Sequence, residues 1–401
     1  VHSLIAAKKV VSAYTPTYGG AAEAVMKMAF GNFLGFEYSA DLTLDEIFGY
    51  SYGSFILELA DGVECTCGAK VLGEIVAEPV LKYGGKSLCL GKTYETYAGK
   101  LEGVYPVHVK GEDEKVETIG SPSDKYTRVR TTEHFAKPRV LIPAFPGTNC
   151  EFDTAKALAS AGFVPEIVVV RNLTSAAVAE SVDYFAKAVK NSQVIFVPGG
   201  FSGGDEPDGS GKFITAFFRN GAIKEATNEM LKTRLGLMCG ICNGFQAIIK
   251  LGLVPYGEII DTDENAPTLT FNTIGRHQSR IVRTRIASNK SPWLAETNVG
   301  DVYNVAISHG EGRFIANDDV LKQIIANGQV ATQYVDADGN PTMDIDYNPN
   351  GSVMAIEGIT SPDGRVLGKM GHTERYNPGL YANVPGCYDM KIFAAAKKYF
   401  E

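Results

Sequence analysis

The chain has 401 residues, of which 45% are hydrophobic, 10% aromatic and 21% charged, and its formal net charge is −8 at pH 7. A chain of this length is too long for one ordinary hydrophobic core, so we expect a globular protein with two domains. An acidic balance without a basic run argues against a nucleic-acid partner. No stretch approaches the ~18 apolar residues of a membrane span, and the start VHSLIAAKK lacks the features of a signal peptide. We therefore expect a cytoplasmic protein that binds small molecules.

Seven cysteines are too few and too scattered for a disulfide scaffold in a chain of this length. Cys65 and Cys67 form one close pair, and Cys239 and Cys242 form another. No further pair stands at the spacing of a zinc ribbon, so we expect no metal site.

The first domain is expected to span residues 1–137. Residues 17–32, TYGGAAEAVMKMAFGN, place two glycines before an amphipathic helix, and SYGSFILELA and CGAKVLGEIVAEPVL are typical of an α+β domain. Gly19 and Gly20 allow two interpretations, a phosphate held at the helix N-terminus or close packing of the helix. The polar segment from Ser121 to about Arg139 contains two prolines and reads as the linker that ends this domain.

Residues 138–401 alternate short β-branched runs with helical stretches. The runs include RVLIPA, PEIVVV, QVIFVPGG and LGLMC, and segments such as DTAKALASAG and SAAVAESVDYFAKAVK separate them. This alternation predicts βαβ units, and therefore a parallel sheet with helices on both faces in an α/β domain.

The sharpest chemical signal is the string GICNG, residues 240–244, between an apolar run and the helical stretch FQAIIKLG. A nucleophile on a tight strand-to-helix turn requires small neighbours, which the flanking glycines supply. Cys242 would then lie at a helix N-terminus, where free amides and the helix dipole favour its thiolate. The alternative is a buried, unreactive cysteine in a tight turn. Cys239, inside the strand, is expected to be inert.

Acyl transfer also requires donors to the oxyanion and a base for the thiol. The amide of Asn243 and the turn Pro198–Gly200 are candidate donors, since adjacent parallel strands end at one edge, although a plain turn is the alternative. Two tripeptides compete for the base, beginning at His309 and at His372. Each places Glu two residues after His, which on an extended strand puts both side chains on one face. Spacing alone does not choose; the strand-like RVLGKM before His372 favours that residue.

With these elements assembled, residues from about 138 to 401 resemble the class I (triad-type) glutamine amidotransferases, and within them the phosphoribosylformylglycinamidine synthase branch. Four strings carry the resemblance: PGTNCEFD at 146–153, GGFSGGD at 199–205, GICNGFQ at 240–246 and SHGEGR at 308–313. The resemblance implies a flavodoxin-like, mostly parallel sheet with helices on both faces.

The resemblance also implies a role for individual residues. Cys242 is the implied nucleophile, His372 the base and Glu374 its orienting partner. The implied contacts to glutamine or to the oxyanion come from Gly199, Gly200, Asn243, Gln246, Ser308, His309 and Gly310. Family members often have proline between the two last triad residues, where this chain has Thr373. No cofactor is implied for this domain.

YTPTYGGAAEAVMKMAFGNFLGF resembles the carboxyl-terminal subdomain of the aminoimidazole ribonucleotide synthetase superfamily. The implied partners are glutamine and synthetase domains of the same polypeptide that precede this chain. ATP and Mg²⁺ would then serve the full-length enzyme, which amidates formylglycinamide ribonucleotide, and this chain would carry the glutaminase half-reaction. Two alternatives remain open: a cysteine hydrolase or deglycase of the same fold, and a binding or regulatory module with an inactive site.

Overall fold

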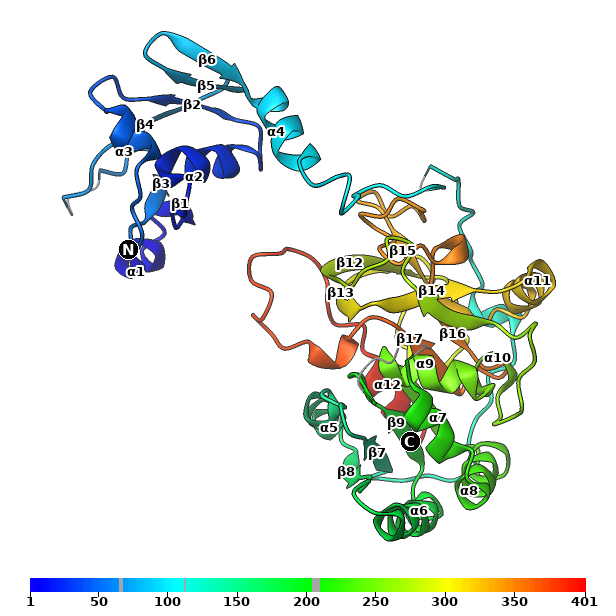
Figure 1. Cartoon of the computed structure of the whole chain (residues 1–401). Helices are drawn as coiled ribbons and strands as arrows, with labels where there is room; N and C mark the ends of the chain where they lie inside the picture. Colours follow the sequence, from blue (N-terminus) through cyan, green and yellow to red (C-terminus); the bar gives the residue numbers. More distant parts are fainter. Residues whose placement is uncertain (65–67, 112, 204–209) are drawn as a thin grey trace. The chain divides into compact units, whose positions relative to one another are not determined.

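The computed structural model describes residues 1–64, 68–111, 113–203 and 210–401. The chain divides into two compact units, Val1–Pro106 and Val107–Glu401, which are coloured from blue to cyan and from cyan to red in Figure 1. Four residues singled out in the sequence lie outside the described ranges: Cys65, Cys67, Gly204 and Asp205. Among the described residues no helix is both long and apolar enough to cross a membrane.

The division falls at residue 106 rather than near residue 137. The residues between these two positions, which include most of the expected linker from Ser121 onward, belong to the second unit. The backbone N–H of Ile119 donates to Oε1 of Gln333 at 2.9 Å, and Nη1 of Arg285 donates to the carbonyl of Ile119 at 2.8 Å. Ser121 pairs with Ser288 in a parallel bridge. A segment without apolar periodicity can thus be fixed by backbone hydrogen bonds to a distant sheet, which its composition does not reveal.

The first unit is a small α+β domain. Its helices are α1 (His2–Ala6), α2 (Gly20–Ala29), α3 (Leu44–Phe48) and α4 (Leu90–Gly99). Its strands are β1 (Val10–Tyr14), β2 (Gly35–Tyr38), β3 (Ile56–Leu59), β4 (Gly73–Val76), β5 (Val80–Tyr83) and β6 (Lys86–Cys89). β1 pairs with β3, and the other four form a sheet in the order β4-β2-β5-β6. The small core is built around Val25, Ile47, Leu81 and Leu90.

The two glycines before α2 serve helix packing. Gly20 has φ +64°, and a Cβ there would meet the carbonyl of Gly49 closer than real Cβ atoms approach. The amide of Gly19 donates to the Glu23 carboxylate at 2.8 Å, so this helix end carries its own anion. These contacts favour the packing interpretation over a bound phosphate.

The second unit contains a nine-stranded sheet in the order β13-β12-β15-β16-β17-β10-β9-β7-β8. In chain order its strands are β7 (Arg139–Ala144), β8 (Val164–Val169), β9 (Val194–Val197), β10 (Leu237–Ile241), β12 (Gln278–Ile286), β13 (Val302–His309), β15 (Val330–Val335), β16 (Ile356–Thr360) and β17 (Val366–Lys369). β11 (Thr268–Phe271) and β14 (Glu311–Ile315) form a separate antiparallel pair.

Helices connect or follow these strands. They are α5 (Glu151–Ser160), α6 (Ser175–Val189), α7 (Lys212–Phe218), α8 (Gly221–Lys232), α9 (Asn243–Lys250), α10 (Leu253–Tyr256), α11 (Asp318–Ala326) and α12 (Ile392–Lys398). Single 3₁₀ turns are η1 (Ser123–Lys125), η2 (Pro292–Leu294), η3 (Val353–Ala355) and η4 (Thr373–Arg375).

The sheet is mixed, with a parallel part and an antiparallel part. β17, β10, β9, β7 and β8 pair in parallel, whereas β13, β12, β15, β16 and β17 pair antiparallel. The parallel part is the one that the alternation of short runs and helices predicted. Its central strands β9 and β10 are buried at every position, which suits strands covered on both faces. The structure therefore confirms the α/β class.

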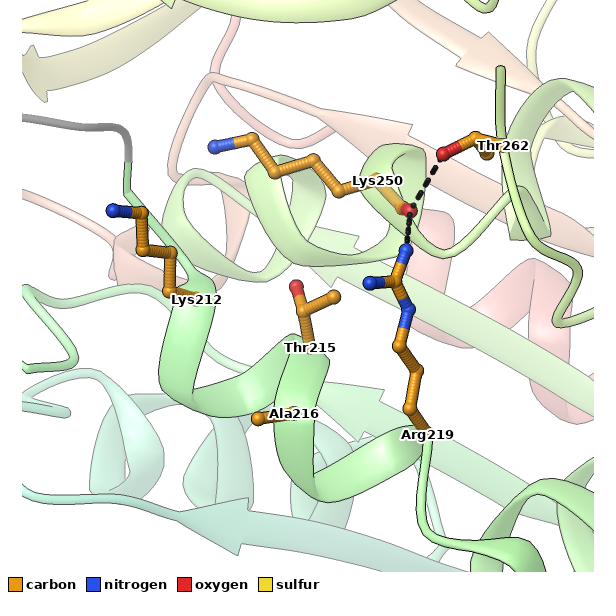
Figure 2. A pocket seen from close by; sticks show the side chains of 6 residues that line it. All are labelled: Lys212, Thr215, Ala216, Arg219, Lys250 and Thr262. Atoms are coloured by element: carbon orange, nitrogen blue, oxygen red, sulfur yellow. Dashed lines mark hydrogen bonds between the residues drawn. The ribbon is translucent and has the colours of Figure 1, made fainter.

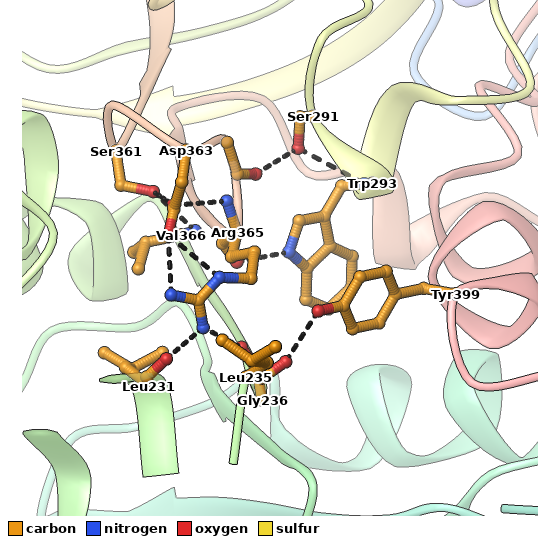
Figure 3. A network of polar contacts seen from close by, with 11 residues as sticks. Leu231, Leu235, Gly236, Ser291, Trp293, Ser361, Asp363, Arg365, Val366 and Tyr399 are labelled. Atoms are coloured by element: carbon orange, nitrogen blue, oxygen red, sulfur yellow. Dashed lines mark hydrogen bonds and ion pairs between the residues drawn. The ribbon is translucent and has the colours of Figure 1, made fainter. Parts of the chain in front are cut away.

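A polar network fixes the turn between β16 and β17 (Figure 3). Arg365 donates through Nε to Asp363 at 2.8 Å and through Nη1 to the carbonyl oxygens of Leu231 and Gly236. Nε1 of Trp293 donates to the Arg365 carbonyl at 3.1 Å. A buried guanidinium is stable only when its N–H groups have acceptors. These contacts therefore hold Arg365, the residue before β17, in place. β17 in turn leads to His372.

Candidate active site

Cys242 stands on the tight turn between β10 and α9. Its backbone has φ +53° and ψ −106°, a strained conformation for a residue with a side chain. A Cβ on Gly244 would overlap the Val197 carbonyl, and one on Gly240 would lie 2.7 Å from the Gly244 carbonyl. The predicted need for glycines around the nucleophile thus has a steric cause. The first N–H groups of α9 have no partner within the helix, so they are available for other acceptors at the Cys242 end.

The neighbouring strand brings a second turn to the same edge. β9 runs parallel to β10, with Val197 opposite Gly240, and the turn at Gly199 and Gly200 follows. The loop after β7 lies against this turn: the amides of Asn149 and Cys150 both donate to the Gly199 carbonyl at 3.3 Å. The strings PGTNCEFD and GGFSGGD therefore meet beside the string GICNGFQ. These are three of the four strings that carried the resemblance.

His372 and Glu374 form a buried pair. Nδ1 of His372 lies 2.6 Å from Oε1 of Glu374, and both side chains are buried. The expectation that an extended strand carries His372 and Glu374 was wrong. β17 ends at Lys369, and His372 is the N-cap residue of the 3₁₀ turn η4. The two side chains meet because the chain turns, not because an extended strand puts them on one face.

The surroundings of His372 favour its protonated form. Burial is the largest single influence and lowers the pKa of the ring, but the Glu374 carboxylate and the nearby Cys242 and Cys150 outweigh it. The net result is a pKa well above the ordinary value for histidine. Since Nδ1 faces Glu374, Nε2 is the ring nitrogen left for Cys242.

Gly199 shows how tightly these groups converge. A Cβ built on Gly199 would lie 2.7 Å from Cε1 of His372, 3.1 Å from Sγ of Cys150 and 3.4 Å from Cβ of Cys242. The first of these distances is one that real Cβ atoms do not adopt. The glycine is required here because the imidazole occupies the space that a side chain would fill.

Cys150 belongs to the string PGTNCEFD, but no sequence pattern assigned it a role of its own. It is fully buried, and its thiol donates to Oδ1 of Asn149 at 3.0 Å. Its sulfur also lies 3.7 Å from Nδ1 of His372. Burial raises the pKa of this thiol, with His372 acting against that effect. Cys239, by contrast, lies inside β10, where burial raises its thiol pKa well above the ordinary value, in line with the expected inertness.

A buried ion pair behind His372 was also missed. Nζ of Lys369 lies 3.3 Å from Oε1 of Glu357, and both side chains are shielded from solvent. Nζ also donates to the Gly371 carbonyl at 2.8 Å and to Thr373 at 3.0 Å. The carbonyl of Lys369 accepts the amide of Cys242 at 2.9 Å. Lys369 therefore links the turn at Cys242 to the turn at His372. No sequence pattern had marked this lysine as part of the site.

Several of the residues expected to hold glutamine lie next to Cys242. The thiol of Cys242 points at the Ser308 carbonyl at 3.8 Å. Asn243 donates to Gln246 at 2.9 Å, and Gln246 donates to the Glu311 carbonyl. Both polar ends of the Gln246 side chain are thus engaged within the protein, and this side chain links α9 to the start of β14.

His309, the competing histidine, has a different environment. Its ring is buried, and neither ring nitrogen has a hydrogen-bond partner. Burial, with the positive charges that His372 and His277 can carry, lowers its pKa to about 3. A ring with this pKa is neutral at physiological pH and lacks an orienting acid, whereas His372 has one. The carbonyl of the adjacent Gly310 accepts the amide of Asn272 at 2.9 Å.

A hollow of about 400 Å³ lies at the opposite end of α9 from Cys242. Its lining residues, drawn in Figure 2, are Lys212, Thr215, Ala216, Arg219, Lys250 and Thr262. Arg219 and Thr262 donate to the Lys250 carbonyl at 3.3 and 3.5 Å. These contacts cap the carboxyl end of the helix, where a cation suits the helix dipole. The hollow contains none of the groups described above.

Comparison with known proteins agrees with this arrangement. Residues 137–400 match the CobB/CobQ-like glutamine amidotransferase domain. The chain is 35% identical over 255 residues to "Phosphoribosylformylglycinamidine synthase subunit PurQ" of Methanococcus maripaludis, covering 63% of this chain and 87% of that protein. The protein of the same description from Sulfurimonas denitrificans is 31% identical over 263 residues, covering 64% of this chain and all of that protein.

Among solved structures, "Structure of PurLQS from Thermotoga maritima" matches with 26% identity and a TM-score of 0.47, covering 66% of this chain and all of that one. The family match spans more than half of the residues and includes every group described around Cys242. The chain therefore belongs to the CobB/CobQ-like glutamine amidotransferase family, and its second unit is a glutamine amidotransferase domain.

Proposed function

We propose that this chain hydrolyses glutamine through Cys242, His372 and Glu374 and supplies the ammonia for the amidation of formylglycinamide ribonucleotide in purine biosynthesis. The observation that supports the triad most directly is the buried His372–Glu374 pair, with a short Nδ1–Oε1 distance, beside a cysteine on a strained turn. The relatives described as synthase subunits support the choice of the final acceptor.

In the proposed mechanism, the Cys242 thiolate attacks the side-chain amide carbon of glutamine. The amides of Asn243 and Gly200 donate to the developing oxyanion. His372, protonated and held by Glu374, gives its Nε2 proton to the departing nitrogen, and ammonia leaves. A water molecule, deprotonated by the now neutral ring, then attacks the thioester and releases glutamate.

Glutamine is proposed to lie along the end of β13 and Gly310, the residue that follows it. Backbone groups of Ser308, His309 and Gly310 would hold its amino-acid end, and Gly199 leaves room beside the sulfur. Gln246 takes part by fixing the Glu311 carbonyl rather than by direct contact, because both ends of its amide are already bonded.

The first unit is proposed to be the carboxyl-terminal subdomain of an aminoimidazole ribonucleotide synthetase-like module, with residues 138–401 as the glutaminase. The synthetase domains that precede it in the same polypeptide would bind ATP and Mg²⁺ and use the ammonia, and the enzyme would work in the cytoplasm. The described residues of the first unit contribute an α+β fold consistent with this assignment.

Active-site labelling tests this proposal. A chloroketone analogue of glutamine should alkylate Cys242 stoichiometrically, as mapped by peptide mass spectrometry, and excess glutamine should protect it. Cys239, buried inside β10, is the internal control and should remain unmodified. Labelling without protection by glutamine would favour a cysteine hydrolase or deglycase with another substrate. No labelling, even with the synthetase portion added, would favour an inactive regulatory module.

A further inference from the structure

Three buried side chains near the nucleophile form a cluster that the proposed hydrolysis does not use in full. Cys150, His372 and Glu374 offer sulfur, nitrogen and oxygen atoms that all lie within 4.8 Å of one another. They come from the loop after β7 and from η4, and Cys150 and His372 are 222 positions apart in the chain. No metal site was expected from the cysteine spacing, because that reasoning considered only ligands that are close in sequence.

The distances in the cluster suit a thiophilic divalent cation. Zinc binds sulfur at about 2.3 Å and imidazole nitrogen at about 2.0–2.1 Å, so tetrahedral coordination separates these two atoms by about 3.6 Å. Sγ of Cys150 and Nδ1 of His372 are 3.7 Å apart. A zinc ion can therefore bridge them with almost no movement of either side chain.

The carboxylate supplies the third ligand. Oε1 of Glu374 faces Nδ1 of His372, whereas Oε2 is buried and has no hydrogen-bond partner. A buried carboxylate oxygen without a partner is costly, and a cation would satisfy it. Three protein ligands of mixed sulfur, nitrogen and oxygen type leave one position open, as in many zinc sites.

We propose that Cys150, His372 and Glu374 form an inhibitory site for Zn²⁺ or a cation of the same thiophilic class. Zinc on Nδ1 replaces the proton that this nitrogen shares with Glu374. The remaining ring proton then resides on Nε2, since a neutral imidazole carries only one. A neutral, metal-bound ring is a weaker acid than the imidazolium held by Glu374, so Nε2 no longer gives its proton readily to the departing nitrogen and glutamine hydrolysis slows.

The proton balance of this step is simple. Binding releases the thiol proton of Cys150 and, from the protonated ring, the Nδ1 proton of His372, so two protons enter solution for each ion bound. No electron transfer occurs and no other reactant is needed. Zinc affinity should therefore rise with pH.

Metal binding by the full 401-residue chain tests the proposal without any need for catalytic activity. Zinc alone is titrated by equilibrium dialysis, and cobalt is substituted to give a sulfur-to-cobalt charge-transfer band. The wild-type chain, Cys242→Ala and Cys239→Ala should share one binding equivalent that Cys150→Ala lacks. Loss of a direct ligand should weaken that equivalent at least about 100-fold. Cys150→Ser, which retains the hydrogen bond to Asn149, repeats the test if the alanine variant folds poorly.

Two results would overturn the site. One is unchanged binding and an unchanged charge-transfer band in both Cys150 variants, and the other is loss of the ion in Cys242→Ala. The inhibitory part is tested separately by ammonia release, with the wild type and the Cys150 variants each compared with its own zinc-free rate. Zinc that binds through Cys150 in the wild type but leaves its rate unchanged would contradict the inhibitory role. The binding measurements stand whether or not glutamine proves to be the substrate.

Discussion

At the scale of single residues, the two histidines near Cys242 have different surroundings. His372 has a buried acid against Nδ1 and a raised pKa, while His309 has no hydrogen-bond partner and a lowered one. Sequence spacing could not separate them, because each histidine precedes a glutamate by two positions. The difference arises from which side chains the fold brings to each ring.

Replacement of the orienting acid tests the role of Glu374. Glu374→Gln keeps the volume but removes the charge that supports a protonated His372 ring. We expect kcat for ammonia release to fall by about 10²–10⁴-fold. Glu401→Gln, at the exposed chain end, serves as the control and should leave kcat unchanged. A fall of less than tenfold would argue that the acid is not required.

The lowered pKa of His309 predicts a pH effect on stability. Its folded-state pKa is about 3, and its unfolded value is about 6.5. Between these values the unfolded chain binds the extra proton, so His309 costs stability progressively as pH falls below about 6.5, by up to about 1.4 kcal/mol per pH unit. In denaturant titrations from pH 7 to pH 5, His309→Leu should lose less stability than the wild type. Parallel losses in both proteins would contradict the assignment.

The ion pair between Lys369 and Glu357 predicts a structural cost. Lys369→Met leaves a buried carboxylate without its counter-charge, which should lower the free energy of unfolding by about 3–5 kcal/mol. The double variant with Glu357→Leu removes both charges and should recover part of this loss. The two effects are compared in a double-mutant cycle by urea denaturation. Simple additivity would show that the charges do not interact.

At the scale of elements, the strand–turn–helix unit around Cys242 depends on close backbone approach. A Cβ on Gly244 would overlap the Val197 carbonyl, so Gly244→Ala must shift β9 or α9. We expect a loss of about 1–3 kcal/mol in stability together with a lower rate of glutamine hydrolysis. Gly221→Ala is the matched control, since nothing lies within 4 Å of the added Cβ at the start of α8. Equal effects of the two changes on stability would refute the steric explanation.

Elements with a local signature could be predicted from the sequence, and others could not. The runs of β7 to β10 alternate with helices, so their parallel pairing followed from the pattern. The antiparallel strands β12, β13, β15 and β16 pair across long stretches of chain, and no local pattern indicates their order. Likewise, the string GICNG locates Cys242 by itself. The position of Cys150 beside His372 instead depends on the fold, which brings the loop after β7, the turn after β9 and the turn after β17 together.

At the scale of the whole molecule, the chain consists of two units that meet in sequence at residues 106 and 107. Composition placed the boundary near 137 because the polar segment from Ser121 to about Arg139 looks like a linker. In the structure, the N–H of Ile119 donates to Gln333, and the carbonyl of Ile119 accepts from Arg285. Polar contacts of this kind are specific to the folded state and have no counterpart in hydrophobic periodicity.

Two truncations test where the second unit begins. A chain of residues 107–401 retains the bonds to Ile119, and one of residues 138–401 lacks them. Each buried group left without a partner costs about 1–3 kcal/mol, so the shorter chain should unfold at lower denaturant concentration. Equal midpoints for the two chains would place the boundary at 137 after all.

The central claim is that Cys242 acts as a nucleophile on glutamine with His372 as its base. The most direct test is ammonia release from glutamine by the 401-residue chain, with and without the synthetase portion added, for the wild type, Cys242→Ala, His372→Ala and Cys239→Ala. We predict that the first two variants lose release entirely and that Cys239→Ala retains it. Unchanged release in His372→Ala would contradict the account.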